Sequence, residues 1–337
     1  MATITYTVDP GGTGDYTSLN ACSVANATNL VGSGNNVIIE CFSSDGTADT
    51  TAVDLTAWTC SFNSGETLTI ACTDTLTASW NTDIYRLSVS NVAAAIRLYG
   101  SGIILDGLQI EVAATNANYQ NAINIVAQSS NNPSVVKNCL CKGANQGTYR
   151  ERVVYITPGV SRVIYFYNNV VYNANTTVAH PANSAIAFGA GVANVYMYKN
   201  VISGGYNNIF YSTGASNLIA KNTILEGASN ALTSAAVTWD ASSDYNATDQ
   251  SSGLRGGINE RYSQTFDFTD KSNGEYTLTA DDTGAKGFGV DLSGDTPSVT
   301  TDRLGETLES PFDIGAYQFL GGGIIFPFNL INPLGGM

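Results

Sequence analysis

The sequence has little charge, a single histidine and no long apolar run. Asp, Glu, Lys and Arg together make up 12% of its 337 residues, against about 25% in typical globular proteins. Hydrophobic residues make up 43%, and this excludes global disorder, because disordered chains combine few apolar residues with many charges. The chain is therefore expected to fold and to cover its surface mainly with uncharged polar side chains.

Basic residues are especially scarce. The chain has 14 of them against 28 acidic residues, a net charge of −14 at pH 7. No basic cluster is present that would hold a phosphate backbone or an anionic bilayer. No apolar stretch approaches the ~20 residues that a membrane-spanning helix needs. We therefore expect neither nucleic acid nor a membrane as a partner.

The first residues, from Met1 to Asp9, have neither the basic nor the apolar region of a secretory signal. The expectation is a soluble chain that stays in the cytoplasm where it is made, or leaves it without such a signal. Removal of a signal from an exported or cell-surface protein is the alternative, because the composition suits exported proteins.

Cysteine and histidine offer no metal site. The six cysteines contain no Cys-x-x-Cys pair, and the lone His180 cannot complete a zinc set. We expect buried free thiols, which pack as small apolar side chains, and no metal or cofactor. A disulfide between Cys60 and Cys72 is the alternative.

What the sequence does have is a near-repeat. Asn138, Asn169, Asn200 and Asn222 follow one another at spacings of 31, 31 and 22 residues. Apolar pairs keep step upstream of them: Ile123/Ile125, Val154/Ile156, Ile186/Phe188 and Ile209/Tyr211. Two rows in register are typical of a solenoid. Aligned on these Asn residues, the positions three before them are also apolar: Val135, Phe166, Met197 and Ile219. The Asn residues are expected to stack at the turns and bond backbone groups inside the bend.

The rest of the chain fits an all-β protein. From Val37 onward, short segments rich in β-branched and aromatic residues are broken by Gly, Asn, Ser and Asp, as expected for strands. Capping residues Thr17 and Ser18 predict one short helix across the open end of the solenoid. The expected organisation is an N-terminal cap over 1–34, a solenoid over 35–270, a closing module over 271–320 and a tail over 321–337.

Short coils, apolar rows and Asn at turns resemble the right-handed parallel β-helix of the pectin-lyase-like superfamily, over roughly residues 35–270. The end of the chain, Asp313-Ile-Gly-Ala-Tyr-Gln-Phe, resembles the closing module of many bacterial and phage β-helix proteins, with Gln318 in place of the usual Glu. The resemblance implies a structural role, covering the last coil, with Asp302, Arg303 and Asp313 as a polar clasp. It implies the fold and leaves the activity open.

Enzymes of this fold need clustered carboxylates, and acids are few here. Between residues 107 and 225 the only ones are Glu111 and Glu151. Asp106 lies five residues before Glu111 and is expected on a different part of the turn. The candidate catalytic set is therefore Glu151 with Arg150 and Arg152, and the favoured interpretation of these three is a solvated loop pair worth little energy.

Tyrosines form the first candidate partner-binding feature. If Ile164/Phe166 and Val195/Met197 point inward, then Tyr165/Tyr167 and Tyr196/Tyr198 point outward on adjacent coils. An exposed strip of this kind would stack on sugars or meet a protein partner. The alternative is that a loop or a neighbouring subunit covers it.

The apolar tail is the second candidate. It begins with three glycines, is too short to span a membrane and contains two prolines that forbid a continuous helix. It is expected to dock as an extended peptide on another chain, with docking along its own rod as the alternative. Its apolar side chains are Ile324, Ile325, Phe326, Phe328, Leu330 and Ile331.

These features favour a non-enzymatic structural or attachment protein. The resemblance implies a bacteriophage virion component, a capsid decoration or tail-fibre-like β-helix, assembled in the host cytoplasm. Its expected partners are other virion or assembly proteins and a cell-surface polysaccharide, and a homo-oligomer is expected, with a trimer as the first candidate. The alternative is a carbohydrate-active enzyme, either a polysaccharide lyase (depolymerase) or a glycoside hydrolase, or a secreted adhesin.

Overall fold

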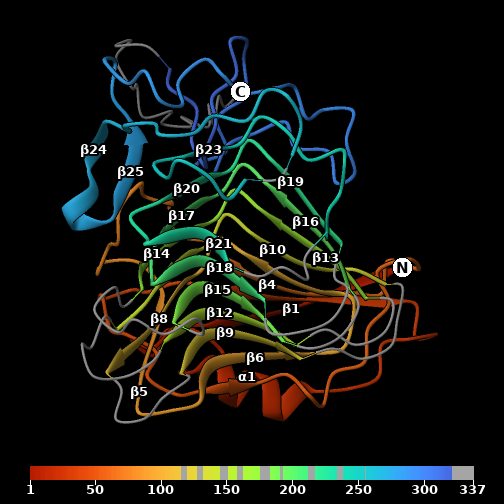
Figure 1. The fold of residues 1–337 in the computed structure, drawn as a ribbon. Coiled ribbons are helices and arrows are strands. Elements are labelled where there is room, and N and C mark those ends of the chain that lie inside the picture. Colours follow the sequence, from red (N-terminus) through yellow and green to blue (C-terminus); the bar gives the residue numbers. More distant parts are fainter. Residues whose placement is uncertain are drawn as a thin grey trace, which may run out of the picture.

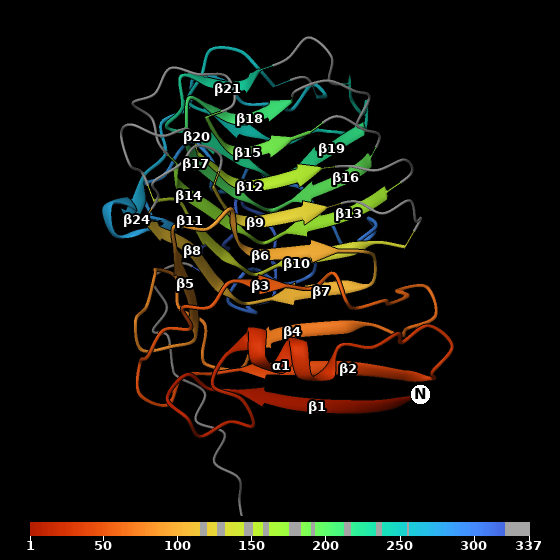
Figure 2. The ribbon, with the colours of Figure 1, turned by 90° about the horizontal axis from the view of Figure 1, so that it is seen from below.

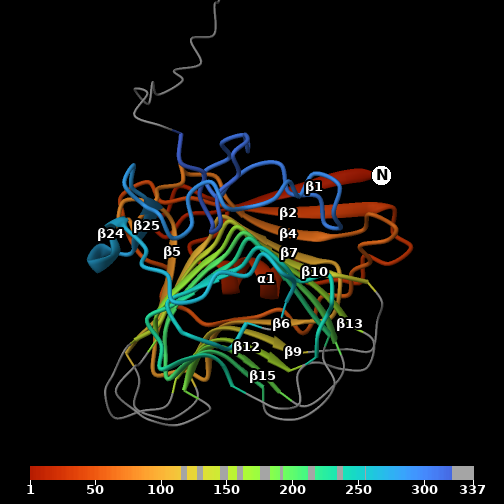
Figure 3. The same ribbon diagram turned by 45° about the horizontal axis from the view of Figure 1, so that its top comes forward.

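The computed structural model describes residues 1–114, 120–126, 132–144, 151–157, 162–174, 183–189, 193–211, 217–233, 238–254 and 256–320. The chain forms an all-β parallel β-solenoid with a single α-helix among the described residues. Its strands stack into three parallel sheets along one axis (Figures 1 and 2). A view closer to that axis shows the three sheets enclosing a common interior (Figure 3).

From β4 to β21 each turn of the solenoid places one strand in each of the three sheets. Sheet 1 has nine strands: β1 (Ala2–Val8), β2 (Asn35–Cys41), β4 (Leu68–Cys72), β7 (Ile103–Asp106), β10 (Ser134–Lys137), β13 (Arg162–Tyr167), β16 (Ala193–Tyr198), β19 (Asn217–Lys221) and β22 (Thr238–Trp239). Sheet 2 has seven: β5 (Arg86–Ser90), β8 (Gln109–Ala114), β11 (Leu140–Lys142), β14 (Val170–Ala174), β17 (Val201–Gly204), β20 (Ile224–Glu226) and β23 (Ala247–Thr248). Sheet 3 has seven: β3 (Val53–Asp54), β6 (Ala94–Tyr99), β9 (Asn121–Val126), β12 (Arg152–Thr157), β15 (Ser184–Phe188), β18 (Asn207–Tyr211) and β21 (Asn230–Thr233).

The predicted apolar rows lie in sheet 3 and pair as expected. Val154 pairs with Ile123 on one side and Ile186 on the other, and the row continues to Ile209. Ile123, Val154, Ile186 and Ile209 are all buried in one continuous core. Because side chains alternate along a strand, this register sends one residue in two into the solenoid interior.

The helix α1 (Leu19–Asn26) closes one end of this interior. Ser18 caps it, its hydroxyl accepting from the Ala21 amide at 3.1 Å. Leu19 and Cys22 are buried in the core, and α1 lies within the outline of the three sheets (Figure 3). The short helix is therefore confirmed. β1 precedes it and pairs with β2, so solenoid pairing begins inside the segment that the sequence assigned to the cap.

The Asn row needs a correction of one residue. At the corner between sheets 1 and 2 each turn has two positions, and the first has a positive φ at Asn138, Asn168, Lys199 and Asn222. Asn tolerates this left-handed conformation better than most residues. Asn138 and Asn222 thus occupy the first position, while Asn169 and Asn200 occupy the second, so the four are not equivalent.

The second corner position holds the hydrogen-bonded ladder. Asn200 Oδ1 accepts from the Asn169 amide at 3.0 Å, and Asn200 Nδ2 donates to the Phe166 carbonyl at 2.9 Å. Asn169 bonds the Cys139 amide and the Val136 carbonyl in the same way. The predicted Asn ladder is therefore present at Asn169 and Asn200, and it bonds backbone groups at and beside the bend.

The same slip of one residue misplaced two apolar side chains. Phe166 pairs with Val136, and Met197 pairs with Ala220. Val135 and Ile219 therefore point to the opposite face from Phe166 and Met197, because a one-residue shift reverses every side chain of a strand. Phe166 and Met197 belong to the interior core, whereas Ile219 packs on the outside.

All six cysteines are free, and five of them are buried. Burial raises the pKa of Cys22 to about 11 and that of Cys60 to about 12. The prediction of buried free thiols is confirmed, and the alternative Cys60–Cys72 disulfide is wrong. Their high pKa values keep these thiols protonated and poorly reactive at neutral pH.

Residues 285–319, here the C-terminal segment, run along the outside of the corner between sheets 1 and 2 (Figure 3). Val290 bonds Asn222, Thr301 bonds Asn168, and Arg303 reaches back to the Thr77 carbonyl. The resemblance implied that this segment covers the last coil, but its contacts run down the side of several coils.

The motif Asp313-Ile-Gly-Ala-Tyr packs against an apolar column on the outer face of sheet 2. Ile314 and Ala316 are buried there with Leu140, Val170, Val201, Ile224 and Ala247. A Cβ on Gly315 would lie 2.8 Å from Ile224 Cδ1, and Gly315 has a φ of +104°. The glycine is thus required by a close approach as well as by its backbone conformation.

Before this segment the chain forms a small hairpin beside sheet 2 (Figure 1). It consists of β24 (Phe268–Asp270), the 3₁₀-helix η1 (Lys271–Asn273) and β25 (Glu275–Leu278), with β24 and β25 antiparallel. Its aromatic residues Phe268 and Tyr276 pack on the same cluster as the C-terminal segment.

Candidate ligand-binding groove

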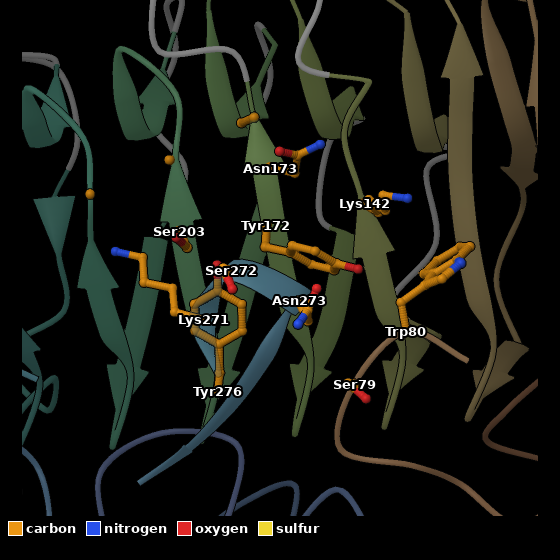
Figure 4. A pocket seen from close by; sticks show the side chains of 13 residues that line it. Ser79, Trp80, Lys142, Tyr172, Asn173, Ser203, Lys271, Ser272, Asn273 and Tyr276 are labelled. Atoms are coloured by element: carbon orange, nitrogen blue, oxygen red, sulfur yellow. The ribbon is translucent and has the colours of Figure 1, made fainter. Parts of the chain in front are cut away.

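A groove of about 930 Å³ lies between the outer face of sheet 2, the hairpin and the chain segment before β5 (Figure 4). This size is typical of small-molecule sites. Three aromatic residues, two lysines and a set of amides and hydroxyls line it: Trp80, Tyr172, Tyr276, Lys142, Lys271, Asn173, Asn273, Ser79, Ser203 and Ser272. The groove combines apolar ring surface with many hydrogen-bonding groups.

The floor is a row of outward-facing residues on successive strands of sheet 2. Glu111 pairs with Lys142, and Lys142 with Tyr172. Ser203, on β17, pairs with Glu226 on β20. Successive members lie about 4.8 Å apart, the spacing of neighbouring strands. The solenoid repeat therefore sets the positions of all the floor side chains.

The hairpin forms one wall. The Tyr276 ring meets the Tyr172 ring edge-on at 5.8 Å between centroids, and Lys271 forms an ion pair with the buried Glu226. A Cβ on Gly274 would lie 2.7 Å from the Tyr172 ring, and Gly274 has a φ of +79°. Only glycine lets the turn of the hairpin lie this close over Tyr172.

The segment that carries Trp80 forms the other wall. Asn81 and Gln109 exchange two hydrogen bonds of 2.7 Å. Just before Trp80, the Ala78 carbonyl accepts from the Tyr317 hydroxyl at 2.7 Å. These bonds hold Trp80 from both sides, and one of the two anchors comes from the C-terminal segment.

Both lysines of the groove have a carboxylate partner. Lys142 Nζ lies 2.8 Å from Glu111 Oε2 and 4.8 Å from the centroid of the Trp80 ring. Lys271 is paired with Glu226. The two carboxylates stand on β8 and β20, four strand steps apart, or about 19 Å. Glycosidases need their two carboxyl groups within about 10 Å, so Glu111 and Glu226 cannot work as such a pair.

Tyr172 supplies the least satisfied polar group of the groove. Its side chain is 6% exposed, and its hydroxyl has no hydrogen-bond partner among the described residues. Figure 4 shows the ring directed along the groove toward Lys142 and Trp80. Burial raises the pKa of the Tyr172 phenol, so it stays protonated at neutral pH and is able to donate a hydrogen bond.

Two of the three candidate catalytic residues, Glu151 and Arg152, lie within the described part of the chain. Glu151 is 5% exposed, and its carboxylate accepts a hydrogen bond from the Ala144 amide. The Arg152 guanidinium stacks on the Tyr155 ring at 4.4 Å. Arg150 lies outside the described residues. The interpretation of these residues as a solvated loop pair is wrong for Glu151, which is buried and ties down the chain after β11.

The Tyr strip has the predicted geometry and a cover. Tyr165 pairs with Tyr196, and Tyr167 with Tyr198; the rings of Tyr165 and Tyr196 are 5.4 Å apart. Tyr198, however, is 2% exposed and packs with Leu292 and Val299 of the C-terminal segment, and Tyr167 and Tyr196 pack on the same cluster. The prediction of an exposed side chain is therefore wrong for Tyr198. The alternative, that a loop covers the strip, holds at Tyr198, where the C-terminal segment is that cover.

The predicted polar clasp consists of buried residues with separate partners. Asp302 accepts from the Leu304 and Gln318 amides, and Asp313 accepts from the Gly287 amide. Arg303 donates to the Thr77 carbonyl. The tail residues Ile324, Ile325, Phe326, Phe328, Leu330 and Ile331 lie outside the described residues.

Sequence reasoning missed the groove, although one signal pointed to it. Glu111, Lys142, Tyr172 and Ser203 follow one another at 31, 30 and 31 residues, the same period as the corner row. A polar row at the coil period marks one outer column of a sheet. Trp80 and the hairpin residues carry no such period, because they come from segments outside the repeat.

Comparisons with known proteins add little. No protein-family model matches the chain, and no curated protein matches it. Among solved structures, the chain is similar to the pectin methylesterase from Aspergillus niger in a deglycosylated and a penultimately deglycosylated form. Each has 14% identity, covers 86% of this chain and 94% of that chain, and gives a TM-score of 0.36. At this score the likeness carries no argument, and the fold stands on the sheet topology itself.

No group of three His, Cys, Asp or Glu side chains in the described ranges is arranged to hold a metal ion. No helix in the same ranges is long and apolar enough to cross a membrane.

Proposed function

We propose that this chain is a non-enzymatic attachment protein that binds a glycan in the groove between Trp80 and the hairpin. The observation that carries the proposal is the composition of the groove: aromatic rings beside amides and hydroxyls, with the nearby carboxylates each held by a lysine. Aromatic faces stack on sugar rings, and amides and hydroxyls bond sugar hydroxyl groups.

The direct test measures binding and cleavage together. The protein is titrated by calorimetry with neutral and acidic oligosaccharides, and each mixture is then assayed for new reducing ends and unsaturated products. We expect binding without new products. Trp80→Ala should weaken binding about ten-fold or more, the loss of at least 1.4 kcal/mol, whereas Phe288→Ala, an exposed aromatic residue elsewhere, should leave it unchanged. Absence of binding to every member of the panel would refute the proposal.

The alternative is a carbohydrate-active enzyme. In its favour, the groove places Lys142 and Lys271 beside carboxylates, and a lysine is able to serve as a base. Against it, both lysines are engaged in ion pairs. New reducing ends that disappear in Lys142→Met or Lys271→Met would establish the enzyme and end the attachment proposal.

We place this attachment protein in a bacteriophage virion, as a capsid decoration or tail-fibre-like component and a homo-oligomer with a trimer as the first candidate. The support is the sequence resemblance and the closing motif at residues 313–319. Deletion of residues 321–337 tests the expected docking role of the tail: the shortened chain should keep its thermal unfolding profile and fail to enter the assembled particle. Normal incorporation of the shortened chain would contradict that role.

A further inference from the structure

We propose that the groove selects an uncharged sugar residue and that the Tyr172 hydroxyl is its buried hydrogen-bonding group. This inference rests on the proposed glycan-binding function and goes beyond it, because it names the chemical class of the ligand and the residue that recognises it.

The charges in the groove favour an uncharged ligand. The two lysines of the groove are each neutralised, Lys142 by Glu111 at 2.8 Å and Lys271 by the buried Glu226. A uronate or sulfate group would have to compete with Glu111 for Lys142, or break the pair of Lys271 and leave the buried Glu226 without its partner, which is costly. The chain as a whole carries −14, so an acidic polymer is repelled at long range as well.

The buried Tyr172 hydroxyl lacks a hydrogen-bond partner among the described residues. A buried hydroxyl without a partner costs roughly 1–3 kcal/mol, and native proteins rarely keep one without a reason. This hydroxyl belongs to a residue that lines the groove, and its ring points along the groove (Figure 4). A sugar hydroxyl placed there is able either to donate to the phenol or to accept from it, since a phenol offers both functions.

Tyr172 and Trp80 are both held in place by their neighbours. The Tyr172 ring is fixed by Tyr276 on the hairpin at 5.8 Å, and the Gly274 turn lies close over it. Trp80 is held through the paired bonds of its neighbour Asn81 with Gln109. Groups held in place before the ligand arrives lose little freedom on binding, which favours affinity. The site is thus built in advance for a ligand that meets Trp80 and Tyr172 together.

The test uses Tyr172→Phe, which removes a single oxygen and keeps the ring. The matched control is Tyr198→Phe, a buried tyrosine on sheet 1 whose hydroxyl donates to the Thr296 carbonyl at 3.4 Å. Both variants and the full-length wild type are titrated by calorimetry with glucose, mannose and galactose oligosaccharides and with oligomers of galacturonate and mannuronate. Thermal unfolding of each variant is recorded beside the titrations.

The expected result is binding of at least one neutral series and weaker or no binding of the acidic ones. Tyr172→Phe should weaken neutral binding about three- to ten-fold, with a melting temperature equal to or above that of the wild type, because no hydrogen bond is lost in the free protein. Tyr198→Phe should bind like the wild type.

Two results would overturn the inference. Tighter binding of the acidic series, or wild-type affinity in Tyr172→Phe, would refute it and leave the glycan-binding function standing. No binding of any oligosaccharide by the wild type would refute the inference together with the proposed function. If bound water alone satisfies the Tyr172 hydroxyl, Tyr172→Phe should keep wild-type affinity for the sugar, and this result would refute the inference.

Discussion

The outer faces of sheets 1 and 2 come from the same coils and have opposite fates. On sheet 1 the outward Tyr167 and Tyr198 are packed under the C-terminal segment. On sheet 2 the same segment covers the column next to the corner, and the following column, with Lys142 and Tyr172 as neighbours, forms the floor of the groove beneath the hairpin. The repeat makes both faces, and the segment after the repeat decides which one is covered.

The same segment also helps to build the open face. Tyr317 and Arg303 bond the carbonyls of Ala78 and Thr77, more than 220 residues earlier in the chain, directly before Trp80. Covering one face and shaping the other are therefore two effects of a single docking event.

The largest effect is expected from Asn200→Ala at the corner that both faces share. Asn200 bonds the Asn169 amide and the Phe166 carbonyl inside the bend. Its loss removes both of these hydrogen bonds to buried backbone groups, at about 1–3 kcal/mol each, so the free energy of unfolding should fall by about 2–6 kcal/mol. Denaturant titration measures this change.

The matched control for the corner is Asn194→Ala. Asn194 is an exposed residue on β16, the strand that leads into the corner of Asn200, so its substitution should change stability by less than about 0.5 kcal/mol. Equal effects of the two substitutions would mean that the ladder does not support the corner.

The sequence predicted the repeat well, because stacking forces the same side-chain pattern on every coil. Ile123, Val154, Ile186 and Ile209 occupy one inward row as predicted. The sequence alignment of the corner was wrong by one residue, because Asn suits both corner positions. The first position has a positive φ, and the second uses a side-chain amide to bond the backbone. Lys199 in the first position hid the break in the pattern.

The groove could not be predicted from local pattern. Its floor row has the coil period, but Trp80 and Tyr276 reach it from non-repeating segments nearly 200 residues apart. Likewise, nothing local in Tyr198 indicates that Leu292 and Val299 will cover it. Solenoid strands are fixed by their neighbours in the stack, whereas the placement of the hairpin and the C-terminal segment depends on contacts of high sequence separation.

Leu292→Ala should loosen the cover of sheet 1. Leu292 is fully buried against Tyr198, and truncating a buried leucine costs about 2–5 kcal/mol. Hydrogen exchange should show faster exchange in residues 290–308, while the interior strands stay protected. Leu304→Ala in the same segment is the control, because Leu304 is partly exposed and its truncation creates no buried cavity. Unchanged exchange in Leu292→Ala would mean that the cover is held elsewhere.

Lys199 makes the corner sensitive to alkaline pH. Burial lowers its pKa from 10.5 to about 8, although Asp313 and Asp302 nearby favour the charged form. Between these two values the unfolded chain binds more protons than the folded chain, so stability rises as the pH increases from 8 to 10.5. The gain should be about 3 kcal/mol and should be lost again as the pH falls through 8.

The measurement compares the wild type with Lys199→Met by denaturant titration at pH 7.5 and pH 10, because other lysines and tyrosines contribute equally to both proteins. The difference in unfolding free energy between wild type and variant should move in favour of the wild type at the higher pH. A difference that does not depend on pH would show that Lys199 titrates normally.

The smallest effect on stability, and the sharpest contrast between the faces, is expected from two lysines of one coil. Lys137 on sheet 1 pairs with Asp106 at 2.9 Å, and Lys142 on sheet 2 pairs with Glu111 at 2.8 Å. Both lysines are partly exposed, so Lys137→Met and Lys142→Met should each cost about 1 kcal/mol or less. Only Lys142→Met should alter glycan binding, because only Lys142 lines the groove and contacts Trp80. If Lys137→Met weakens binding as much as Lys142→Met does, the ligand contacts sheet 1 as well. The proposal that only the sheet 2 face binds the ligand would then be wrong.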